Sequence, residues 1–465
     1  MQRLASVSSP ARRNSDTTID LRQGEGRMSN RGSLLRVLGI TFGIAVVVGG
    51  MVGQGILRTP GIIAGAVHSP ELILALWAMG ALLAGLSAFA YVELATAIPC
   101  AGGPYDFVRR AFGPLAGVVT GWGAWLILVT LEGFLGIVVA EFLHRLGVFT
   151  ELPQPVVAIG VLALFWVVNL TSTRIAGESQ VVLSALKGAA LIALIILLFS
   201  HPAAGVSATG GEIAGPIGIA ALAIAMRNVM NTYNGWDEVV YFGEEIKKPE
   251  RTLPRAIALG IAGVAILYLL VNLALLHVLS PAQMAGSKLV AADAMMIVMG
   301  PTGELATTIF AVISVAAITN LAMMKSARIS FALARSGDLP GKLATVAATG
   351  IPRWALGVSS LLAMVFAATG TYETVVAMNV AVGLVIVIAV NFAVIRLRRS
   401  EPDLARPFRM PWFPLPALLA VALNAVLLAA LIYEDPFHSL AGLVALALIA
   451  GIYSVIQREP RAQVA

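Results

Sequence analysis

Long apolar stretches, separated by short polar or glycine- and proline-rich joints, follow one another along most of the chain. A membrane-spanning helix takes about 20 apolar residues, whereas a strand of a membrane barrel takes only about 9–11 alternating residues. The pattern therefore predicts an all-α polytopic membrane protein with twelve transmembrane helices. The twelve segments lie near 36–67, 72–97, 113–143, 156–172, 178–200, 215–244, 254–278, 300–334, 354–369, 373–396, 412–433 and 437–456.

The composition of the 465 residues supports a membrane protein. Hydrophobic residues make up 58% of the chain and charged residues only 12%, whereas a soluble domain has about 25% charged residues. The single cysteine and the five scattered histidines give no disulfide framework and no paired metal ligands. The residues indicate no catalytic group, metal site or cofactor, because the chain has no recognisable nucleophile–base pair and no phosphate-binding loop.

The positions of Lys and Arg predict the orientation of the helices. An even number of spans places both termini on one side, and a cytosolic N-terminus puts most of the 31 Lys and Arg in cytosolic regions. Only Arg145 and Lys288 then fall in outside loops, in agreement with the positive-inside rule. This distribution explains the net charge of +6 without a nucleic-acid partner.

We therefore expect a plasma membrane protein, located in the inner membrane if the cell is Gram-negative, with both termini cytosolic. The polar residues 1–33 predict a disordered cytosolic tail without a cleavable signal peptide. Met28 within this tail is an alternative first residue. A second cytosolic tail is expected at 458–465.

Two of the apolar segments are interrupted by turn-forming residues. The first contains GGMVGQGILRTPG (49–61) and the sixth contains NTYNG (231–235). Each glycine inside a helix costs about 1 kcal/mol relative to alanine. Glycines in a single segment are also typical of close helix packing. Two breaks at corresponding positions favour a transporter built from inverted repeats, with its binding site at the breaks.

The breaks have a chemistry that suits a zwitterion. The N-terminal end of the half-helix after a break has free N–H groups and a positive dipole end, which favour a carboxylate. The C-terminal end of the half-helix before a break has free carbonyls, which favour an ammonium group. Because glycine has no Cβ, the backbone can approach a ligand closely. The two ends together indicate an α-amino acid as the substrate. The protein that binds it is embedded in the lipid bilayer.

Three cationic residues lie within or beside the membrane segments. Lys187 is in the middle of the fifth segment, where a charge costs from about 3 to above 10 kcal/mol and must face protein or water. A snorkelling structural lysine is the alternative. Arg58 and Arg227 lie on the outward side of the breaks. They either attract an acidic substrate, pair with a membrane carboxylate such as Glu132, or face the outer vestibule.

Four ordered motifs resemble those of amino acid permeases in the amino acid–polyamine–organocation superfamily. Together they extend over about residues 36–400, and the last two segments carry little signature. The motifs are GQGILRTPG (53–61), AYVELATAIPCAGGPYDFVRRAFGPLAGVVTGW (90–122), YNGWDEVVYFGEEIKKPERTLPRAI (233–257) and ARSGDLP (334–340).

The resemblance implies a five-plus-five inverted repeat, 34–200 and 215–398, with discontinuous helices 1 and 6, two additional helices within 410–457, and amino acid transport by alternating access. Backbone N–H groups would receive the substrate carboxylate and carbonyls would hold its amino group. The residues implied are, in that order, Gly53, Gln54, Gly55 and Ile56, then Asn231, Thr232, Tyr233 and Asn234. Gln54 departs from the Ser or Thr common in the family and can add a side-chain amide to the site.

The resemblance also assigns roles to three further side chains. Lys187 matches the lysine that stands in the cation position of sodium-independent members, which implies proton symport or exchange. Tyr233 and Trp236 match aromatic gates, with packing as the alternative. A polyamine or organic-cation carrier remains an alternative that predicts carboxylates near the breaks, where only Asp237 and Glu238 lie. A channel predicts a continuous polar filter, and a non-transporting scaffold is a further alternative.

The charged residues after the second break have two interpretations. Glu244 and Glu245, with the basic residues that follow them, form either a solvated cytosolic loop or the ion pairs of an inner gate. Glu93, at the end of the second segment, is expected to cap a helix or pair with a cation on the cytosolic side.

Overall fold

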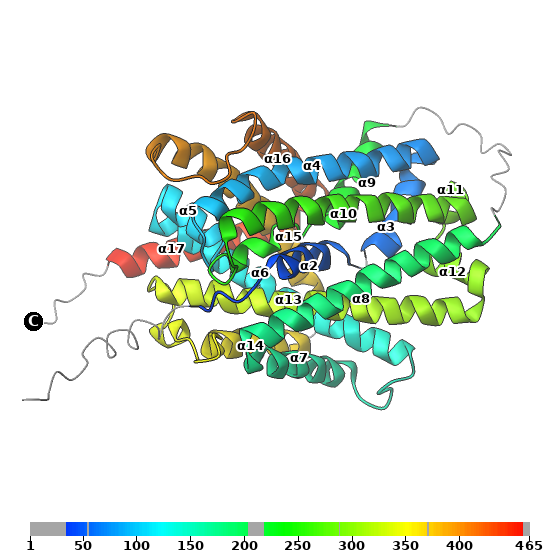
Figure 1. Cartoon of the computed structure of the whole chain (residues 1–465), viewed down its shortest axis with the longest axis horizontal. Helices are drawn as coiled ribbons and strands as arrows, with labels where there is room; N and C mark the ends of the chain where they lie inside the picture. The colour runs from blue at the N-terminus through cyan, green and yellow to red at the C-terminus, as the bar shows by residue number, and fades with distance from the viewer. Residues whose placement is uncertain (1–33, 54, 203–217, 288, 370–371, 459–465) are drawn as a thin grey trace, which may run out of the picture.

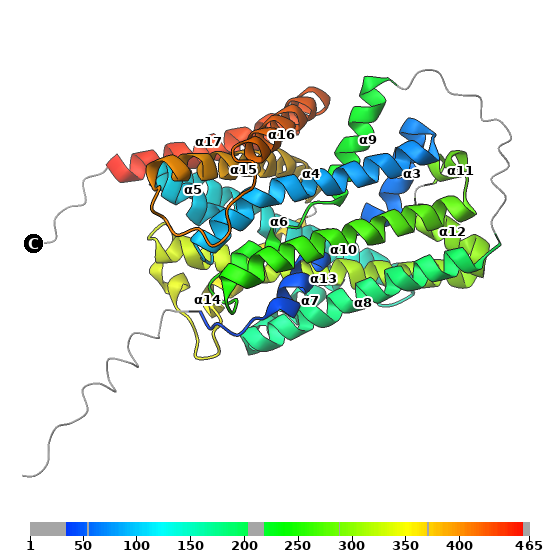
Figure 2. The same ribbon diagram turned by 45° about the horizontal axis from the view of Figure 1, so that its top comes forward.

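The computed structural model describes residues 34–53, 55–202, 218–287, 289–369 and 372–458. The tail expected at 1–33, nearly all of the tail at 458–465, Gln54 and Lys288 lie outside the described residues. Within the described part, the regular elements are α-helices and two short 3₁₀-helices. Most of the helices run along the long axis of the molecule (Figures 1 and 2).

Each of the twelve apolar segments forms helical structure, with short helices in the joints. The helices of the segments are α2 (Ile40–Met51), α3 (Gly55–Val67), α4 (Pro70–Ala97), α6 (Pro114–Arg145), α7 (Gln154–Thr171), α8 (Thr173–Ser200), α9 (Ile219–Thr232), α10 (Pro249–Val278), α13 (Pro301–Arg335), α14 (Arg353–Thr369), α15 (Tyr372–Ser400), α16 (Leu415–Glu434) and α17 (Pro436–Arg458). The short elements are α5 (Pro104–Phe112), η1 (Glu238–Phe242), α11 (Pro281–Ala285), α12 (Val290–Met299) and η2 (Gly341–Ala344).

Nine of the described helices are long and apolar enough to cross a membrane, or ten if α2 and α3 form one bent span. The protein is therefore an all-helical, multi-pass membrane protein. α14 has 17 residues and α9 has 14, so each is shorter than a complete span. The prediction of twelve spans exceeds the nine or ten because these two segments form short helices.

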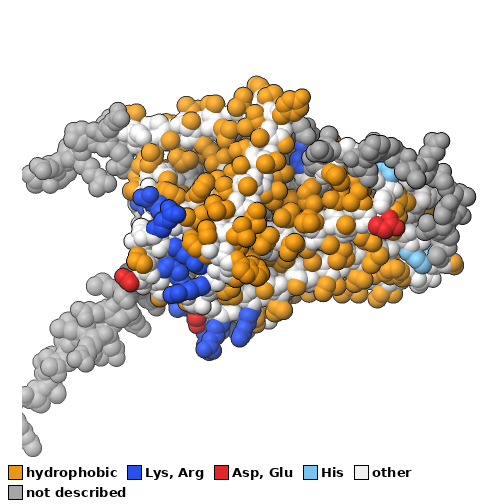
Figure 3. Space-filling view, turned by 90° about the horizontal axis from the view of Figure 1, so that it is seen from above, with side chains coloured by type: hydrophobic (Ala, Val, Ile, Leu, Met, Phe, Trp, Pro, Cys, Tyr) orange, Lys and Arg blue, Asp and Glu red, His pale blue; other side chains and the backbone are white. Residues whose placement is uncertain are grey.

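The surface and the interior divide as a bilayer requires. Apolar side chains cover the face shown in Figure 3, and most of the Lys and Arg visible there gather at one end. The outermost helices α16 and α17 bury only 22% and 17% of their most apolar windows, whereas α6 and α13 bury 61% and 56%. Lipid tails can cover the exposed apolar faces without a protein partner. α6 and α13 therefore form the centre of the bundle.

Local sequence signals explain where several helices begin. Ser69 and Ser172 precede α4 and α8, and their hydroxyl groups accept the N–H groups of Leu72 and Ile175 at 3.3 and 3.1 Å. Proline occupies the first turn of α4, α5, α6 and α10. An N–H group in the first turn has no acceptor within the helix, so proline, which lacks this group, breaks no hydrogen bond there. These local signals define where the five helices begin.

Candidate functional site

The first break separates α2 from α3. α2 ends at Met51, α3 begins at Gly55, and the two helices are bent by 43°. The last carbonyls of a helix have no partner within it, and here side chains of three other helices bind them. Lys187 of α8 donates to the Gly49 carbonyl at 2.6 Å and Tyr268 of α10 donates to that of Met51 at 2.7 Å. Ser314 of α13 lies 3.4 Å from the Val52 carbonyl.

The second break separates α9 from η1. α9 ends at Thr232, and turn residues lead to the five-residue 3₁₀-helix that begins at Glu238. Gly235 in this turn has φ +106°, a conformation that side chains rarely adopt. The Asn234 side-chain oxygen accepts the Gly235 N–H at 3.0 Å. The interruption predicted at 231–235 is therefore confirmed.

The two breaks cross at a pair of glycines. A Cβ added to Gly50 would lie 2.8 Å from the Gly235 carbonyl oxygen, and one added to Gly235 would lie 2.6 Å from the Gly50 carbonyl carbon. The Tyr268 hydroxyl bonds to Met51 and also lies 3.2 Å from the Thr232 carbonyl oxygen. One side chain therefore binds the backbone on both sides of the crossing.

The start of α3 lies beside the end of α9. A Cβ added to Gly55 would lie 3.1 Å from the Thr232 Cγ2 atom, and the Thr232 hydroxyl donates to that of Thr59 at 2.9 Å. The N-terminal end of α3 carries positive partial charge and the C-terminal end of α9 carries negative partial charge. This pair of opposite helix ends is the feature that can bind both ends of a zwitterion.

Four further residues expected to bind the substrate lie in or next to the two breaks along the chain and differ in their surroundings. Gly53 faces α13, because an added Cβ would lie 3.1 Å from Ile318 Cδ1. Ile56 is buried, whereas Asn231 and Asn234 are exposed. Gln54, the other residue expected at the carboxylate end, lies outside the described residues.

Tyr233 and Trp236 pack behind the second break, against α4. The Tyr233 ring lies 5.8 Å from that of Trp77 and 5.0 Å from that of Tyr268. The Trp236 ring meets the Tyr91 ring edge to face at 4.9 Å. Both residues are buried by protein. In this conformation the two rings make packing contacts with the helices that support the break.

The cationic residues occupy different environments. Lys187 is completely buried and its ammonium group binds α2 through Gly49. Arg58 is exposed and Arg227 is half-buried. Neither carboxylate oxygen of Glu132 has a hydrogen-bond partner among the described residues. The alternative in which Glu132 pairs with Arg58 or Arg227 is therefore not what the structure contains.

Comparison with known proteins identifies the family. The sequence profile of the amino acid permeases matches residues 33–455. The chain belongs to the amino acid permease family. This confirms the resemblance drawn from the four motifs, and it makes the protein a membrane transporter rather than an enzyme.

Individual relatives extend over nearly the whole permease. The serine/threonine exchanger SteT of Bacillus subtilis is 24% identical over 433 residues, covering 92% of this chain and 98% of the relative. The b(0,+)-type amino acid transporter 1 of Mus musculus is 26% identical over 419 residues, or 88% and 85% of the two chains. The cystine/glutamate transporter of Homo sapiens is 27% identical over 424 residues, or 88% and 83%.

Ion pairs attach the segment after the second break to α13 of the permease. Lys325 binds Glu238 at 2.7 Å, Arg328 binds Glu245 at 2.5 and 2.7 Å, and Arg335 binds Glu244 at 2.6 and 2.8 Å. The solvated-loop interpretation is wrong for Glu245, which is completely buried. The sequence does not reveal its burial because Arg328 lies 83 residues away along the chain.

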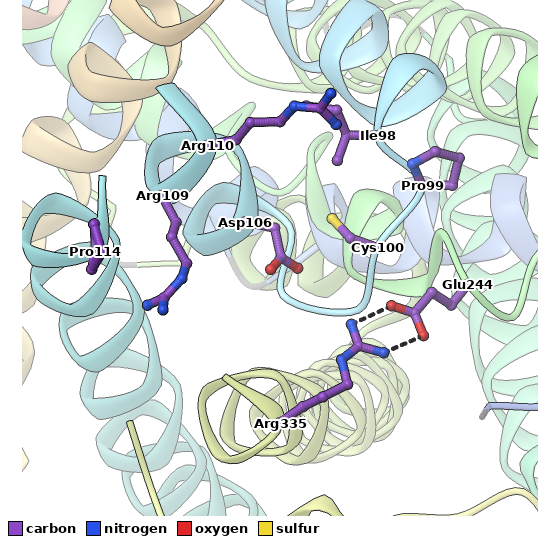
Figure 4. A pocket seen from close by; sticks show the side chains of 9 residues that line it. All are labelled: Ile98, Pro99, Cys100, Asp106, Arg109, Arg110, Pro114, Glu244 and Arg335. Carbon is purple, nitrogen blue, oxygen red and sulfur yellow. Dashed lines mark hydrogen bonds and ion pairs between the residues drawn. The ribbon is translucent and has the colours of Figure 1, made fainter. Parts of the chain in front are cut away.

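A pocket of about 470 Å³ opens beside the outermost of these ion pairs (Figure 4). Glu244 binds Arg335 on its wall and also accepts the Ala101 N–H at 3.2 Å. Asp106 accepts the Gly102 N–H at 2.9 Å. Burial raises the pKa of the Asp106 carboxyl above its ordinary value. The α4–α5 loop, α5 and the end of α13 thus meet around one charged vestibule.

Proposed function

We propose that this permease is a secondary active transporter that moves amino acids across the plasma membrane by alternating access. The observation that carries the proposal is the meeting of the α3 N-terminal end with the α9 C-terminal end, with Gly55 against Thr232. The positive end of one helix attracts the carboxylate of a small zwitterion, and the negative end of the other helix beside it attracts the ammonium group of the same molecule. The substrate is recognised through atoms that every amino acid shares.

The carboxylate end of the proposed site consists of the backbone N–H groups of Gly53, Gln54, Gly55 and Ile56. The first N–H groups of an α-helix have no partner within the helix, and α3 begins at Gly55. The neighbouring side chains leave little room for anything larger than glycine at positions 53 and 55, since an added Cβ would lie 3.1 Å from Ile318 or Thr232. A carboxylate bound here receives hydrogen bonds and the positive helix end together.

The amino end of the proposed site consists of the carbonyl groups of Asn231, Thr232, Tyr233 and Asn234. Two of these carbonyls have partners: Thr232 lies near the Tyr268 hydroxyl, and Asn231 accepts the Asn234 N–H at 3.3 Å. A carbonyl oxygen has two lone pairs, so both can also accept an ammonium group. An amino acid is favoured over a polyamine because Lys325 already binds Glu238, one of the only two carboxylates near the breaks.

Lys187 is proposed to replace a bound sodium ion at the first break. Its ammonium group is buried and hydrogen-bonded to the last turn of α2. A cation there neutralises the negative end of that helix. Transport is therefore expected to be independent of sodium, as a proton-linked symporter or an exchanger. The relatives named as a serine/threonine exchanger and a cystine/glutamate transporter support exchange.

The two ends of the pathway are proposed to open in turn. Tyr233 and Trp236 would gate the site by leaving their packing against α4, and the ion pairs of α13 would hold the cytosolic end closed. Arg58 and Arg227 would face the outer vestibule. Attraction of acidic substrates is the second possibility for these arginines, and it would be contradicted if Arg227→Ala left the uptake of acidic and of neutral substrates equally unchanged from the wild type.

The proposed topology has twelve spans, both termini cytosolic, inverted repeats at 34–200 and 215–398, and two additional helices at 410–457. The gathering of Lys and Arg at one end of the molecule supports this orientation (Figure 3). Cysteine accessibility tests it directly. A cysteine in place of Ser336 in a Cys100→Ala background is expected to react with an impermeant reagent only after the cells are opened.

Transport itself is tested with the purified full-length protein in proteoliposomes. We expect uptake of some members of a panel of radiolabelled L-amino acids, with and without internal unlabelled amino acid and a pH gradient. Signal only with internal amino acid indicates exchange, whereas signal driven by the gradient indicates symport. Lys187→Ala is expected to lose transport, and Ser200→Ala, a hydroxyl at the exposed end of the same helix, is the matched control. Absence of uptake for every amino acid would contradict the proposal.

A further inference from the structure

Glu132 in the centre of α6 is a buried acidic residue without a role in the site described above. Its side chain is completely buried, and neither carboxylate oxygen has a well-formed hydrogen bond among the described residues, with only a weak interaction from the Ser326 hydroxyl. An ionised carboxylate in such a place is far more costly than a neutral one. The arrangement is therefore suited to a carboxylic acid that holds its proton in this conformation.

Lys325 is the charged side chain of α13 that lies near Glu132. Ser326, the next residue, also faces Glu132, and its hydroxyl donates to the Met323 carbonyl at 3.2 Å. The ammonium group of Lys325 binds Glu238 at 2.7 Å, and Asp237 lies within its electrostatic reach. Lys325 thus stands between one carboxylate on a central helix and another at the second break.

The other helices around α6 place their described charges elsewhere. α14 contacts Gly133 through Ala363 and Phe366, and its single charged residue is Arg353 at its far end. α15 contacts Thr130 through Asn379. α7 contains no charged residue. On α5, Asp106 accepts the Gly102 N–H, Arg109 packs against Gly117 and Arg110 binds Glu401. His438 of α17 binds Asp435, and Arg396, Arg398 and Arg399 lie at the end of α15. The Glu373 side chain lies outside the described part.

Glu238 is the first residue of η1, directly after the second break, so a movement of this break changes its position. A Cβ added to Gly50 would lie 2.6 Å from a carboxylate oxygen of Glu238, so this side chain lies against the glycine crossing. The other carboxylate oxygen binds Lys325. A displacement of η1 relative to α13 that the two side chains cannot follow breaks the 2.7 Å contact between Lys325 and Glu238. Lys325 then needs another anion, because an unpaired buried cation is strongly unfavourable.

We propose that Glu132 is the proton-carrying residue of the transport cycle and that Lys325 alternates between Glu238 and Glu132. This inference rests on the proposed function, since alternating access is what moves the second break. With Lys325 bound to Glu238, Glu132 is protonated. When Glu238 moves into water, the O–H bond of Glu132 breaks, its proton passes to cytosolic water, and the carboxylate binds the Lys325 ammonium group.

The charges balance in both states. Before the change, Lys325 and Glu238 neutralise each other and Glu132 is uncharged. Afterwards, Lys325 and Glu132 neutralise each other, Glu238 is hydrated, and one proton has left the protein. As the protein returns to the state that is open to the outside, Glu132 takes up one proton from the external water and Lys325 binds Glu238 again. One proton therefore accompanies each complete conformational cycle, and the coupling ion of the permease is the proton.

The test uses the full-length protein in proteoliposomes that contain the pH-sensitive dye pyranine. With the labelled amino acid that gives the strongest signal, an external solution one pH unit more acidic should drive about tenfold accumulation, because one pH unit corresponds to about 1.4 kcal/mol for each proton. Internal acidification should accompany this uptake. Glu132→Gln should exchange labelled for unlabelled amino acid but lose both accumulation and acidification.

Two further variants make the result specific. Glu132→Asp should retain proton-driven accumulation with a displaced pH profile, since a carboxyl group is still present. Glu141→Gln changes an exposed carboxylate of the same helix, one that binds Arg145 at 2.5 Å, and should behave as wild type. Accumulation and acidification by Glu132→Gln equal to those of the wild type would overturn the inference.

If Glu132→Gln does not fold, measurements on the wild-type protein alone test the role of Glu132. Exchange of amino acids without any response to the pH gradient would overturn the role of Glu132 while leaving the proposed transport function intact. Absence of both exchange and uptake would instead contradict the proposed function. About one proton for each amino acid accumulated would support the inference.

Discussion

The two breaks are stabilised in different ways. At the first break, carbonyl groups at the end of α2 bind side chains from α8, α10 and α13, and α3 then continues as a helix of 13 residues. At the second, only a five-residue 3₁₀-helix follows. Three acidic residues in and after it bind cations of α13. The first break is thus fixed through its backbone, and the second through ion pairs.

This difference indicates which break moves during transport. Hydrogen bonds from buried side chains to backbone carbonyls leave unpaired polar groups in the interior when they break. Ion pairs near an aqueous vestibule can separate if water hydrates the charges. Arg335 and Glu244 line the pocket in Figure 4, so water reaches that pair first. We therefore expect the α9–η1 segment to move relative to α13 while the first break keeps its connections.

The largest expected effect comes from Arg328→Met. The variant leaves Glu245 buried without its partner, which costs about 3–5 kcal/mol, and we expect a large loss of folded protein and of transport. The apparent melting temperature of the purified permease in detergent measures the loss. Arg328→Met combined with Glu245→Leu should recover most of the stability, because the unpaired charge is removed. A double variant as unstable as the single one would show that the charge pair does not hold the second break.

The glycine crossing should be the next most sensitive place. Gly50→Ala adds a methyl group 2.6 Å from a Glu238 oxygen and 2.8 Å from the Gly235 carbonyl oxygen, and overpacking of this kind costs about 1–3 kcal/mol. We expect uptake to fall to a small fraction of wild type. Gly188→Ala is the control, since an added Cβ meets nothing within 4 Å. Wild-type uptake by Gly50→Ala would place the crossing outside the transport mechanism.

Tyr268→Phe should have an intermediate effect. It removes a hydroxyl that lies against the backbone of both breaks and leaves the buried Met51 carbonyl without this partner, at a cost of about 1–3 kcal/mol. The expected results are a lower melting temperature and a weaker apparent affinity, because the Thr232 carbonyl is freed to move. Tyr433→Phe, at a residue that is 90% exposed, should leave both quantities unchanged. Equal values for the two variants would separate Tyr268 from the site.

The positions of the two helix breaks could be predicted from local sequence, because turn-forming residues interrupt apolar segments there. Glycines at 49–55 and NTYNG at 231–235 interrupt apolar segments, and the structure breaks the helices there. The expectation that Glu93 pairs with a cation is confirmed by its bonds to Arg398 at 2.8 and 2.5 Å. The first kind of signal is a run of turn-forming residues within one segment. The second is a charged residue in an apolar helix, which needs a partner of opposite charge.

The residues that sequence reasoning missed depend on contacts between distant segments. Tyr268 and Ser314 look like ordinary members of apolar helices, and nothing nearby shows that they meet the end of α2, 217 and 262 residues away. The burial of Glu245 likewise depends on α13. The shortness of η1 also escaped prediction, because the apolar residues after the second break fit a helix of either kind. Helical period and composition cannot supply such pairings.

The smallest expected effect tests whether burial, rather than charge alone, makes the α13 ion pairs strong. Arg110, which lines the same pocket as Arg335, binds Glu401 at 2.6 and 3.1 Å, but the side chains of this pair are 40% and 33% exposed. The hydrogen bonds from Arg110 lower the pKa of Glu401 below its ordinary value of 4.5. The pair therefore contributes stability above that pH, and the contribution disappears as the pH falls through the lowered pKa.

We expect Arg110→Gln to cost at most about 1 kcal/mol at neutral pH and nothing at strongly acidic pH, as measured by melting of both proteins across that range. A cost as large as that of Arg328→Met would mean that the exposed and the buried ion pairs stabilise the structure equally, and the contrast between the two breaks would then no longer depend on burial.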